Sequence, residues 1–374
     1  MKRLLTILIA AVLCTAAFAQ TQTIYTFTPV RDIPVTSVKD QAATGTCWCF
    51  ATVSFLEAEL LRQGKGEYDL SEMFIVRHNY DERIFDNYLR RGRGNINPGS
   101  IAHMATNAVA KYGIVPESAY HGIQYDSPGH NHRELSTYLK GIADASVELK
   151  NLSPEYNKLV KSLFDIYLGE LPETFTYEGK QYTPESFAKM LGFGDMSEYI
   201  ELTSFSHHPF YQQVPLEIPD NWDNARLWNV PLDDLMAIMD NALTKGYTVA
   251  WDGDLTAGEF QHNRGIAICP NPEDFAEAVK LEKVYPDRVV TQEMRQKDFE
   301  TFRTVDDHLM HLTGLYKDQN GNNFYKTKNS WGEGRNSEMK GYLYMSKAYL
   351  QMRTVSIMVH KDAIPKDIRK KLGL

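Results

Sequence analysis

The sequence predicts an α+β fold that combines a helical part with a mainly antiparallel β part. Three observations carry this prediction. Residues 46–61 are rich in helix formers and lack Gly and Pro, residues 134–200 are charged and mostly helical in pattern, and residues from 308 onward alternate like hairpin strands. With 374 residues and 43% hydrophobic content, the chain can bury a substantial core in one large domain or two lobes.

The elements expected along the chain follow from the same patterns. Residues 20–40 are expected to be extended, and helices are expected at 46–61 and at 101–112, the second closed by Gly113. A buried strand is expected at Tyr247–Trp251, and a hairpin turn at residues 318–323. The interpretation is a helical lobe at about 20–133, a helical insertion at about 134–215 and a β-rich lobe at about 216–374.

The amino terminus resembles a secretory signal. Lys2 and Arg3 precede an apolar run over residues 4–13, and small residues stand before a predicted cleavage after Ala19. The run is too short to span a bilayer, and Leu13 in front of Cys14 disfavours a lipoprotein anchor. We therefore expect residues 1–19 to be a signal peptide and the protein to be exported, to the periplasm or outside the cell, without a membrane anchor.

The charge balance disfavours nucleic acid as a partner. Of the 40 basic residues, Lys2 and Arg3 lie in the predicted leader, so 38 remain against 48 acidic residues, a net charge of −10. The longest basic cluster is residues 369–371. A chain of this charge would repel a phosphate backbone.

Three cysteines follow the predicted leader, Cys47, Cys49 and Cys269. An odd number in an exported chain leaves at least one thiol unpaired, which favours a catalytic nucleophile over a disulfide framework. Cys49 and Cys269 are expected to be buried small hydrophobes, with a disulfide between them as the alternative. A metal site on Cys47 and Cys49 is disfavoured because helix positions two apart diverge.

Cys47 has the context of a reactive thiol. A free thiol has a pKa of ~8.5 and needs a nearby imidazole, and usually a helix start, to act as a nucleophile. Gly45 interrupts any earlier helix, so Cys47 falls in the first turn of the helix expected at 46–61.

Three short strings stand in an informative order. Gln41 lies six positions before Cys47 in QAATGTCW, His308 lies in DDHLMHLTGL, and Asn329 and Trp331 lie in KNSWGEG. Together they resemble the papain-like cysteine peptidases.

The resemblance implies a papain-like two-lobed fold with the active site between the lobes. It implies that Cys47 is the nucleophile, that His308 is the general base and acid, and that Asn329 orients His308. Gln41 would donate an N–H to the oxyanion, a contribution of ~3 kcal/mol. Trp331 would shield the hydrogen bond between Asn329 and His308 from water.

Longer stretches resemble the bleomycin hydrolase and aminopeptidase C branch of this family. They include EYDLSEMFIVRHNYDER at 67–83, NAVAKYGIVPESAY at 107–120, and the LGELPETFTYEGKQYTPESFAKM segment, in which Pro172–Thr176 is not required by a generic papain. Three features depart from the pattern. Thr44 replaces the cysteine of a common disulfide, residues 97–100 read NPGS where the family has Gly-Gly, and the sequence stops at Leu374 without the C-terminal arm of that branch. These departures leave substrate-backbone contacts and exopeptidase gating open.

The sequence therefore predicts a cysteine peptidase that acts on peptide substrates, with aminopeptidase action favoured. Alternatives are an endopeptidase or oligopeptidase, an amidase or acyltransferase on non-peptide amides, and a non-catalytic binding protein with the same fold. No cofactor and no metal are expected. The oligomeric state stays open, a homo-oligomer included.

Three further histidines, His311, His207 and His208, have simpler interpretations. His308 and His311 lie three apart in a strand-like run, so they should face opposite sides and not share zinc. His207 and His208 lie in a loop and are expected to be solvated or on the substrate side, with a metal role as the alternative.

Two remaining pairs are expected at the surface. His130 and His132 lie in a Gly-flanked turn and are expected to be surface residues. Asp252 and Asp254 follow the predicted Trp251 strand and are expected to be exposed turn carboxylates, with contact to a substrate amine as the alternative.

Overall fold

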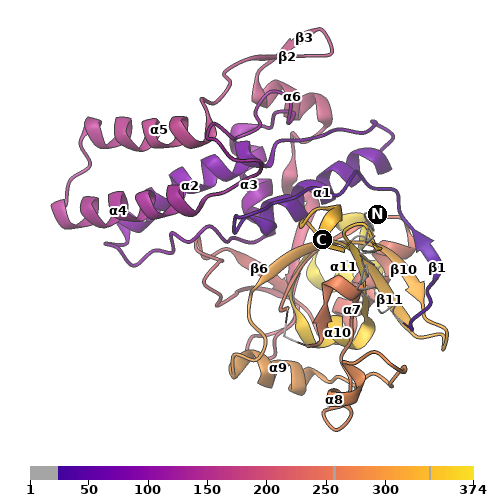
Figure 1. Cartoon of the computed structure of the whole chain (residues 1–374). Coiled ribbons are helices and arrows are strands. Elements are labelled where there is room, and N and C mark those ends of the chain that lie inside the picture. Colours follow the sequence, from indigo (N-terminus) through magenta and orange to yellow (C-terminus); the bar gives the residue numbers. More distant parts are fainter. Residues whose placement is uncertain (1–23, 256–257, 337) are drawn as a thin grey trace, which may run out of the picture.

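A computed structural model describes residues 24–255, 258–336 and 338–374 of the chain. The predicted leader at 1–19, including Cys14, lies outside the described residues. Figure 1 shows helices gathered on one side and a large sheet with its own helices on the other. The predicted α+β class is therefore confirmed. None of the helices that the described residues form is both long enough and apolar enough to cross a membrane.

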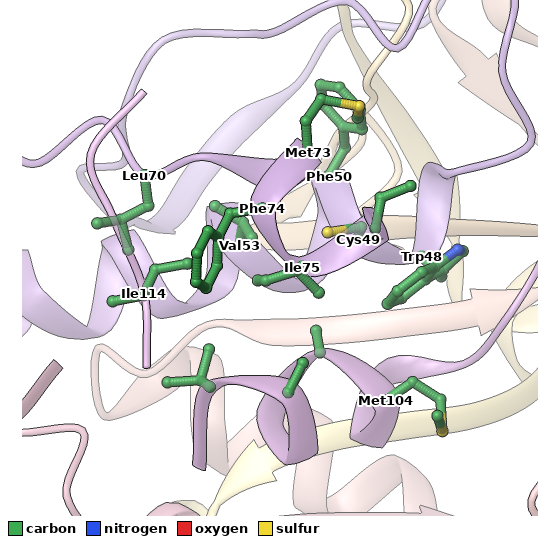
Figure 2. Close-up of a cluster of buried hydrophobic side chains, with 14 of the residues drawn as sticks. Trp48, Cys49, Phe50, Val53, Leu70, Met73, Phe74, Ile75, Met104 and Ile114 are labelled. Atoms are coloured by element: carbon green, nitrogen blue, oxygen red, sulfur yellow. The ribbon is translucent and has the colours of Figure 1, made fainter. Parts of the chain in front are cut away.

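The helical part is built around one deeply buried helix, α1. Every α1 residue from Cys47 to Leu60 is buried, as expected of a helix that is covered on all sides. Figure 2 shows its Trp48, Cys49 and Phe50 side chains among those of the two neighbouring helices. The helices predicted at 46–61 and 101–112 are confirmed, and Gly113 caps the second at φ 78°. The three core helices are α1 (Cys47–Arg62), α2 (Glu72–Leu89) and α3 (Ala102–Tyr112).

Two further helices extend from this part, away from the sheet (Figure 1). They are followed by a short hairpin, in which the Pro172–Thr176 segment enters the first strand, and by one more helix. Ser153 and Thr183 cap two of these helices with their side chains. The elements are α4 (Arg133–Leu149), α5 (Pro154–Leu168), β2 (Phe175–Tyr177), β3 (Lys180–Tyr182) and α6 (Pro184–Leu191).

The other part is a sheet with strand order β5-β6-β4-β13-β7-β10-β11-β12-β9-β8, in which β1 also pairs with β10. Most neighbours are antiparallel, and the hairpin predicted at 318–323 joins β10 to β11. The strands are β1 (Thr28–Asp32), β4 (Tyr199–Thr203), β5 (Gln212–Pro215), β6 (Arg226–Asn229), β7 (Val249–Gly253), β8 (Phe260–Gln261), β9 (Ile266–Ala267), β10 (His308–Lys317), β11 (Asn323–Lys328), β12 (Tyr342–Ser346) and β13 (Thr354–His360).

Strand β10 connects the two parts because its faces pack on different helices. Leu309 belongs to the core around α1, whereas Met310 and Leu312 belong to the core around α7. This is the alternation expected of a strand that is buried on both faces. The helices on the sheet side are α7 (Leu232–Thr244), α8 (Phe275–Ala278), α9 (Gln292–Glu300), α10 (Lys347–Arg353) and α11 (Lys366–Leu372), with single 3₁₀ turns η1 (Met196–Glu198), η2 (His262–Arg264), η3 (Glu333–Asn336) and η4 (Lys361–Ala363).

The chain crosses between the two parts more than once. β1 pairs with β10 although it precedes the helices, and β4 and β5 join the sheet although they lie within the range 134–215. The boundaries of the three regions therefore stay predictions. What matters for the site is that α1 and β10 begin at the junction of the helices and the sheet.

Candidate active site

Cys47 is the first residue of α1, as the sequence predicts. No side chain caps this helix start, because the hydroxyl of Thr46 lies 2.6 Å from that of Thr44. The first N–H groups of a helix have no acceptor within the helix. The Cys47 N–H is therefore available to a ligand at the position where an oxyanion would form.

The loop at 97–100 lies against this helix start. A Cβ on Gly45 would come within 2.7 Å of the Pro98 ring, so only glycine allows this approach. The Trp48 indole N–H also donates to the Pro98 carbonyl at 3.0 Å. The NPGS segment that replaces the family's Gly-Gly string thus borders the nucleophile.

His308 and Asn329 meet at the ends of two paired strands. His308 begins β10, and Asn329 directly follows β11. The His308 Nε2 atom lies 2.8 Å from Asn329 Oδ1, and both side chains are buried. The imidazole is therefore fixed with its other nitrogen, Nδ1, turned away from the amide.

The Cys47 thiol lies at the start of the same strand. The backbone N–H of Leu309, the residue after His308, hydrogen-bonds to it. Burial, with smaller contributions from Asp306, Asp252 and Asp220, raises the pKa of Cys47 to about 12, while the Leu309 N–H acts in the opposite direction.

Burial also lowers the pKa of His308, to about 4, although the Asn329 hydrogen bond opposes this shift. Burial therefore acts against the charged form of both the thiol and the imidazole. Burial of the thiol raises the pKa of Cys47 by more than the helix start is expected to lower it.

Gln41 is held beside this pair by two contacts. Its Oε1 accepts from the Ser330 hydroxyl at 2.7 Å, and its Nε2 donates to the Thr44 carbonyl at 2.8 Å. A carboxamide nitrogen carries two N–H groups, and the second has no acceptor among the described residues. Gln41 can therefore donate to an oxyanion, and its main-chain N–H bonds to the Ser330 carbonyl at 2.8 Å.

The Trp331 indole packs against the His308 ring, with the two ring centres 4.9 Å apart. The same indole lies 4.9 Å from His262, a residue that the sequence gave no reason to select. Asn329 Nδ2 lies 3.3 Å from His262 Nδ1, and because an amide nitrogen only donates, His262 Nδ1 is the acceptor. Burial lowers the pKa of His262 to about 4, which favours the neutral ring that this contact requires. His262 thereby holds the Asn329 amide with its oxygen turned toward His308.

Two pairs that were predicted at the surface are buried. His130 and His132 are 9% and 2% exposed because their loop pairs with Ala43, just before the nucleophile. Asp252 and Asp254 are 1% and 5% exposed, since β7 continues past Trp251 and lies between β10 and β13. The prediction of solvated side chains was wrong for all four residues.

Other predictions about histidines agree with the structure. His311 contacts Ser54 of α1 at 2.9 Å, whereas His308 contacts Asn329, so the two side chains diverge. His207 and His208 lie in a loop and both contact Glu217, at 3.1 and 2.7 Å. The ligand atoms of these three residues lie within 4.8 Å of one another, so the metal alternative for this loop stays open.

The three described cysteines are all free. Cys49 and Cys269 are 0% and 1% exposed, which confirms the prediction of buried small hydrophobes and rules out the disulfide alternative in this structure. The Cys49 thiol donates to the Glu72 carbonyl at 3.3 Å, so it points away from Cys47.

Comparison with known proteins agrees with this geometry. A model of the Peptidase C1-like family matches residues 8–373. Aminopeptidase G of Lactobacillus delbrueckii subsp. lactis is 24% identical over 91% of this chain and 85% of its own length. Aminopeptidase E of Lactobacillus helveticus is 26% identical over 91% of this chain and 84% of its own length.

A solved structure shows the same fold. Pepw from Lactobacillus rhamnosis superposes with a TM-score of 0.70 and 19% identity, covering 92% of this chain and 84% of that one. The family match spans the thiol, imidazole and amide described above. The chain therefore belongs to the Peptidase C1-like family, and it is a papain-like cysteine peptidase of the aminopeptidase C and bleomycin hydrolase branch.

Proposed function

We propose that this peptidase is an aminopeptidase, which removes residues from the amino end of peptides. The supporting observation is that four relatives of this chain are named aminopeptidase C, E, G and W. The alignment with this chain covers 82–85% of the length of each relative. Their amino acid identity with this chain is low, so their substrates are not carried over.

The side chains at the site provide each step of peptide hydrolysis. Cys47 sulfur attacks the scissile carbonyl carbon while His308 Nδ1 takes the thiol proton. The Cys47 N–H and the Gln41 Nε2–H donate to the oxyanion of the tetrahedral intermediate. His308 then protonates the leaving amine, and finally activates the water that hydrolyses the thioester.

A digest of a peptide library, read by mass spectrometry, tests the proposal. Aminopeptidase action gives ladders that shorten by one residue from the amino end, and peptides with an acetylated amino terminus resist. Internal cleavage at many positions would contradict it and would favour the endopeptidase alternative. Cys47→Ala serves as the control for contaminating activity.

Export of the protein remains a prediction from residues 1–19. Mass analysis of the amino terminus of protein recovered from its source tests it, with a chain that begins at Gln20 expected. An intact Met1 in the cytoplasm, or a lipidated Cys14, would contradict it.

A further inference from the structure

Lys328 is a buried cation directly beside the catalytic amide. It is the last residue of β11, it precedes Asn329, and it is 5% exposed. Burial lowers the pKa of Lys328 to about 8, and Glu57 opposes this shift. A lysine is almost never buried to this degree unless its charge has partners. The partners of the Lys328 ammonium group therefore indicate what this side chain does.

The Lys328 ammonium group donates to two hydroxyls that lie outside the strand. Its Nζ is 2.7 Å from Ser54 Oγ and 3.2 Å from Thr36 Oγ1. Ser54 belongs to α1 and stands seven residues, about two helical turns, after Cys47, so both residues lie on the same face of the helix. Lys328 therefore joins the strand that ends beside Asn329 to the helix that begins at Cys47.

The Thr36 hydroxyl continues this network to a carboxylate of the same helix. It donates to Glu57 Oε2 at 2.6 Å, and Glu57 is 0% exposed. The second oxygen of Glu57 accepts from Lys39 Nζ at 3.0 Å. Lys39 lies two residues before Gln41, the oxyanion donor. The network thus contacts the segments that carry the thiol, the amide and the oxyanion donor.

Glu57 keeps its partners without Lys328. The Leu70 N–H donates to Glu57 Oε1 at 2.9 Å, and the Lys39 ammonium group, which contacts the same oxygen, also lies 2.8 Å from Glu72. Loss of the Lys328 charge would therefore leave no unpaired carboxylate at Glu57. A buried ionic network also adds little stability compared with apolar packing. The place of Lys328 is better explained by the geometry that it imposes.

The packing around Lys328 leaves the side chain little freedom. A cavity of about 10 Å³, with room for about one water molecule at most, is lined by Ser54, His311, Lys328 and Asn329, among others. His311 is paired with Lys328 across the sheet, and its Nδ1 contacts the same Ser54 hydroxyl at 2.9 Å. The bridge between β11 and α1 is therefore closely packed on the side of the catalytic amide.

We propose that Lys328 is a positioning residue, which holds the end of β11 against α1 and so sets the place of the Asn329 amide relative to the thiol. Lys328 acts on His308 through Asn329, which lies 2.8 Å from the imidazole. Displacement of a catalytic group by about 1 Å can reduce turnover by up to about 100-fold. A residue that fixes this distance therefore contributes to the rate without contact with the substrate.

The first test replaces the ammonium group by a chain of similar length. With leucine 4-nitroanilide, Lys328→Met should reduce kcat about 30-fold and change KM by less than about threefold, because the substrate contacts remain. Lys326→Met is the matched control, since Lys326 lies two residues earlier in β11 and bonds to the exposed Asp32 at 3.0 Å. It should keep kcat within about twofold. A folded Lys328→Met with a kcat within about threefold of wild type would overturn the proposal.

Alkylation of the thiol tests the positioning without a peptide. Mass spectrometry should show that iodoacetamide labels Cys47 about tenfold more slowly in Lys328→Met than in wild type, because the imidazole is less well aligned. A purely structural role would leave this rate unchanged, and that result would overturn the proposal. If wild type does not cleave leucine 4-nitroanilide, the proposed function fails, and the alkylation rates alone decide this inference.

A double variant tests the route through Asn329. In an Asn329→Ala background, Lys328→Met should reduce kcat by less than a further threefold or so, since the amide that it positions is already absent. An undiminished effect of about 30-fold in this background would overturn the route.

A second variant decides the matter if thermal denaturation shows that Lys328→Met does not fold. Ser54→Ala removes only the hydroxyl on α1, and it should reduce kcat about tenfold and slow the alkylation of Cys47. His311→Ala is its control, because it removes the other contact of Ser54 and leaves the bond to Lys328. A folded Ser54→Ala with the kcat and alkylation rate of wild type would overturn the proposal.

Discussion

The two sides of Cys47 differ in how completely the protein satisfies its own polar groups. On one side, Asn329 bonds to both His308 and His262, and Ser330 fixes Gln41. On the other side, the carboxyl groups of Asp252 and Asp306 hydrogen-bond to each other, and burial raises the pKa of both. The comparison shows that amides and hydroxyls orient the groups for bond cleavage, whereas the two carboxyl groups of the acidic side are joined through a shared proton.

The largest expected effect concerns the thiol, which both sides serve. Cys47→Ala should abolish turnover, a loss of about 10⁴-fold or more, and leave the fold intact because the side chain is small. In wild type, iodoacetamide should label Cys47 before Cys49 and Cys269, which are buried within helix and sheet cores. Peptide mapping of the labelled protein checks this order. Loss of activity with label only on Cys49 or Cys269 would refute the assignment.

The catalytic side predicts a sharp contrast between two buried histidines. His308→Ala should reduce kcat by about 10³-fold or more, since the proposed mechanism transfers the thiol proton to His308. His311→Ala removes a contact with Ser54 and should mainly lower the melting temperature. Steady-state kinetics and thermal denaturation of both variants measure the difference. Equal catalytic losses in two folded variants would contradict the divergence of the side chains along β10.

Two residues on the catalytic side, Asn329 and His262, are expected to affect His308 to different degrees. Asn329→Ala should reduce kcat about 100-fold, and His262→Phe about tenfold, because His262 acts on His308 only through the Asn329 amide. KM should change little in both variants. An effect of His262→Phe that is undiminished in an Asn329→Ala background would show that His262 acts by another route.

The smallest expected effect is a gain in stability on the acidic side. Asp306 has a raised pKa in the folded protein, about 8 against an ordinary value of 3.8. Between these values the folded state holds a proton that the unfolded state releases, so stability falls as pH rises from about 4 to about 8. Asp306→Asn should remove this loss and stabilise the protein by about 1 kcal/mol or more at pH 8.

Thermal denaturation at several pH values measures this gain. The melting temperature of Asp306→Asn should approach that of wild type near pH 4 and exceed it increasingly toward pH 8. Asp307→Asn, which removes the exposed neighbouring carboxylate, is the control. A difference that is constant over this range would mean that Asp306 does not titrate with a raised pKa, and would weaken the contrast between the two sides.

The sequence reveals the catalytic side better than the acidic side for a physical reason. The strings around Cys47 and Asn329 carry local constraints, a helix start and a strand end, that short motifs encode. The burial of Asp252 depends on β13 and β10, which pair with β7 from far along the chain. The burial of His130 likewise depends on Ala43. No local pattern encodes such pairings.

His262 was missed for a related reason. It lies in a single 3₁₀ turn, and only the folded sheet brings it to Asn329. The helices at 46–61 and 101–112 were predictable because their periodicity and capping glycine are local. The burial of individual loop residues was not predictable, because it depends on packing between the two parts of the molecule.

The pairing of β1 with β10 has a consequence for the time at which the peptidase becomes active. Thr28 is aligned with Lys317 across these strands, so the strand that carries His308 is completed by contacts between distant parts of the chain. Such nonlocal contacts form late, because loop-closure entropy opposes them. During synthesis the thiol emerges long before its base. A nascent chain is therefore unable to cleave itself or its neighbours until folding is nearly finished.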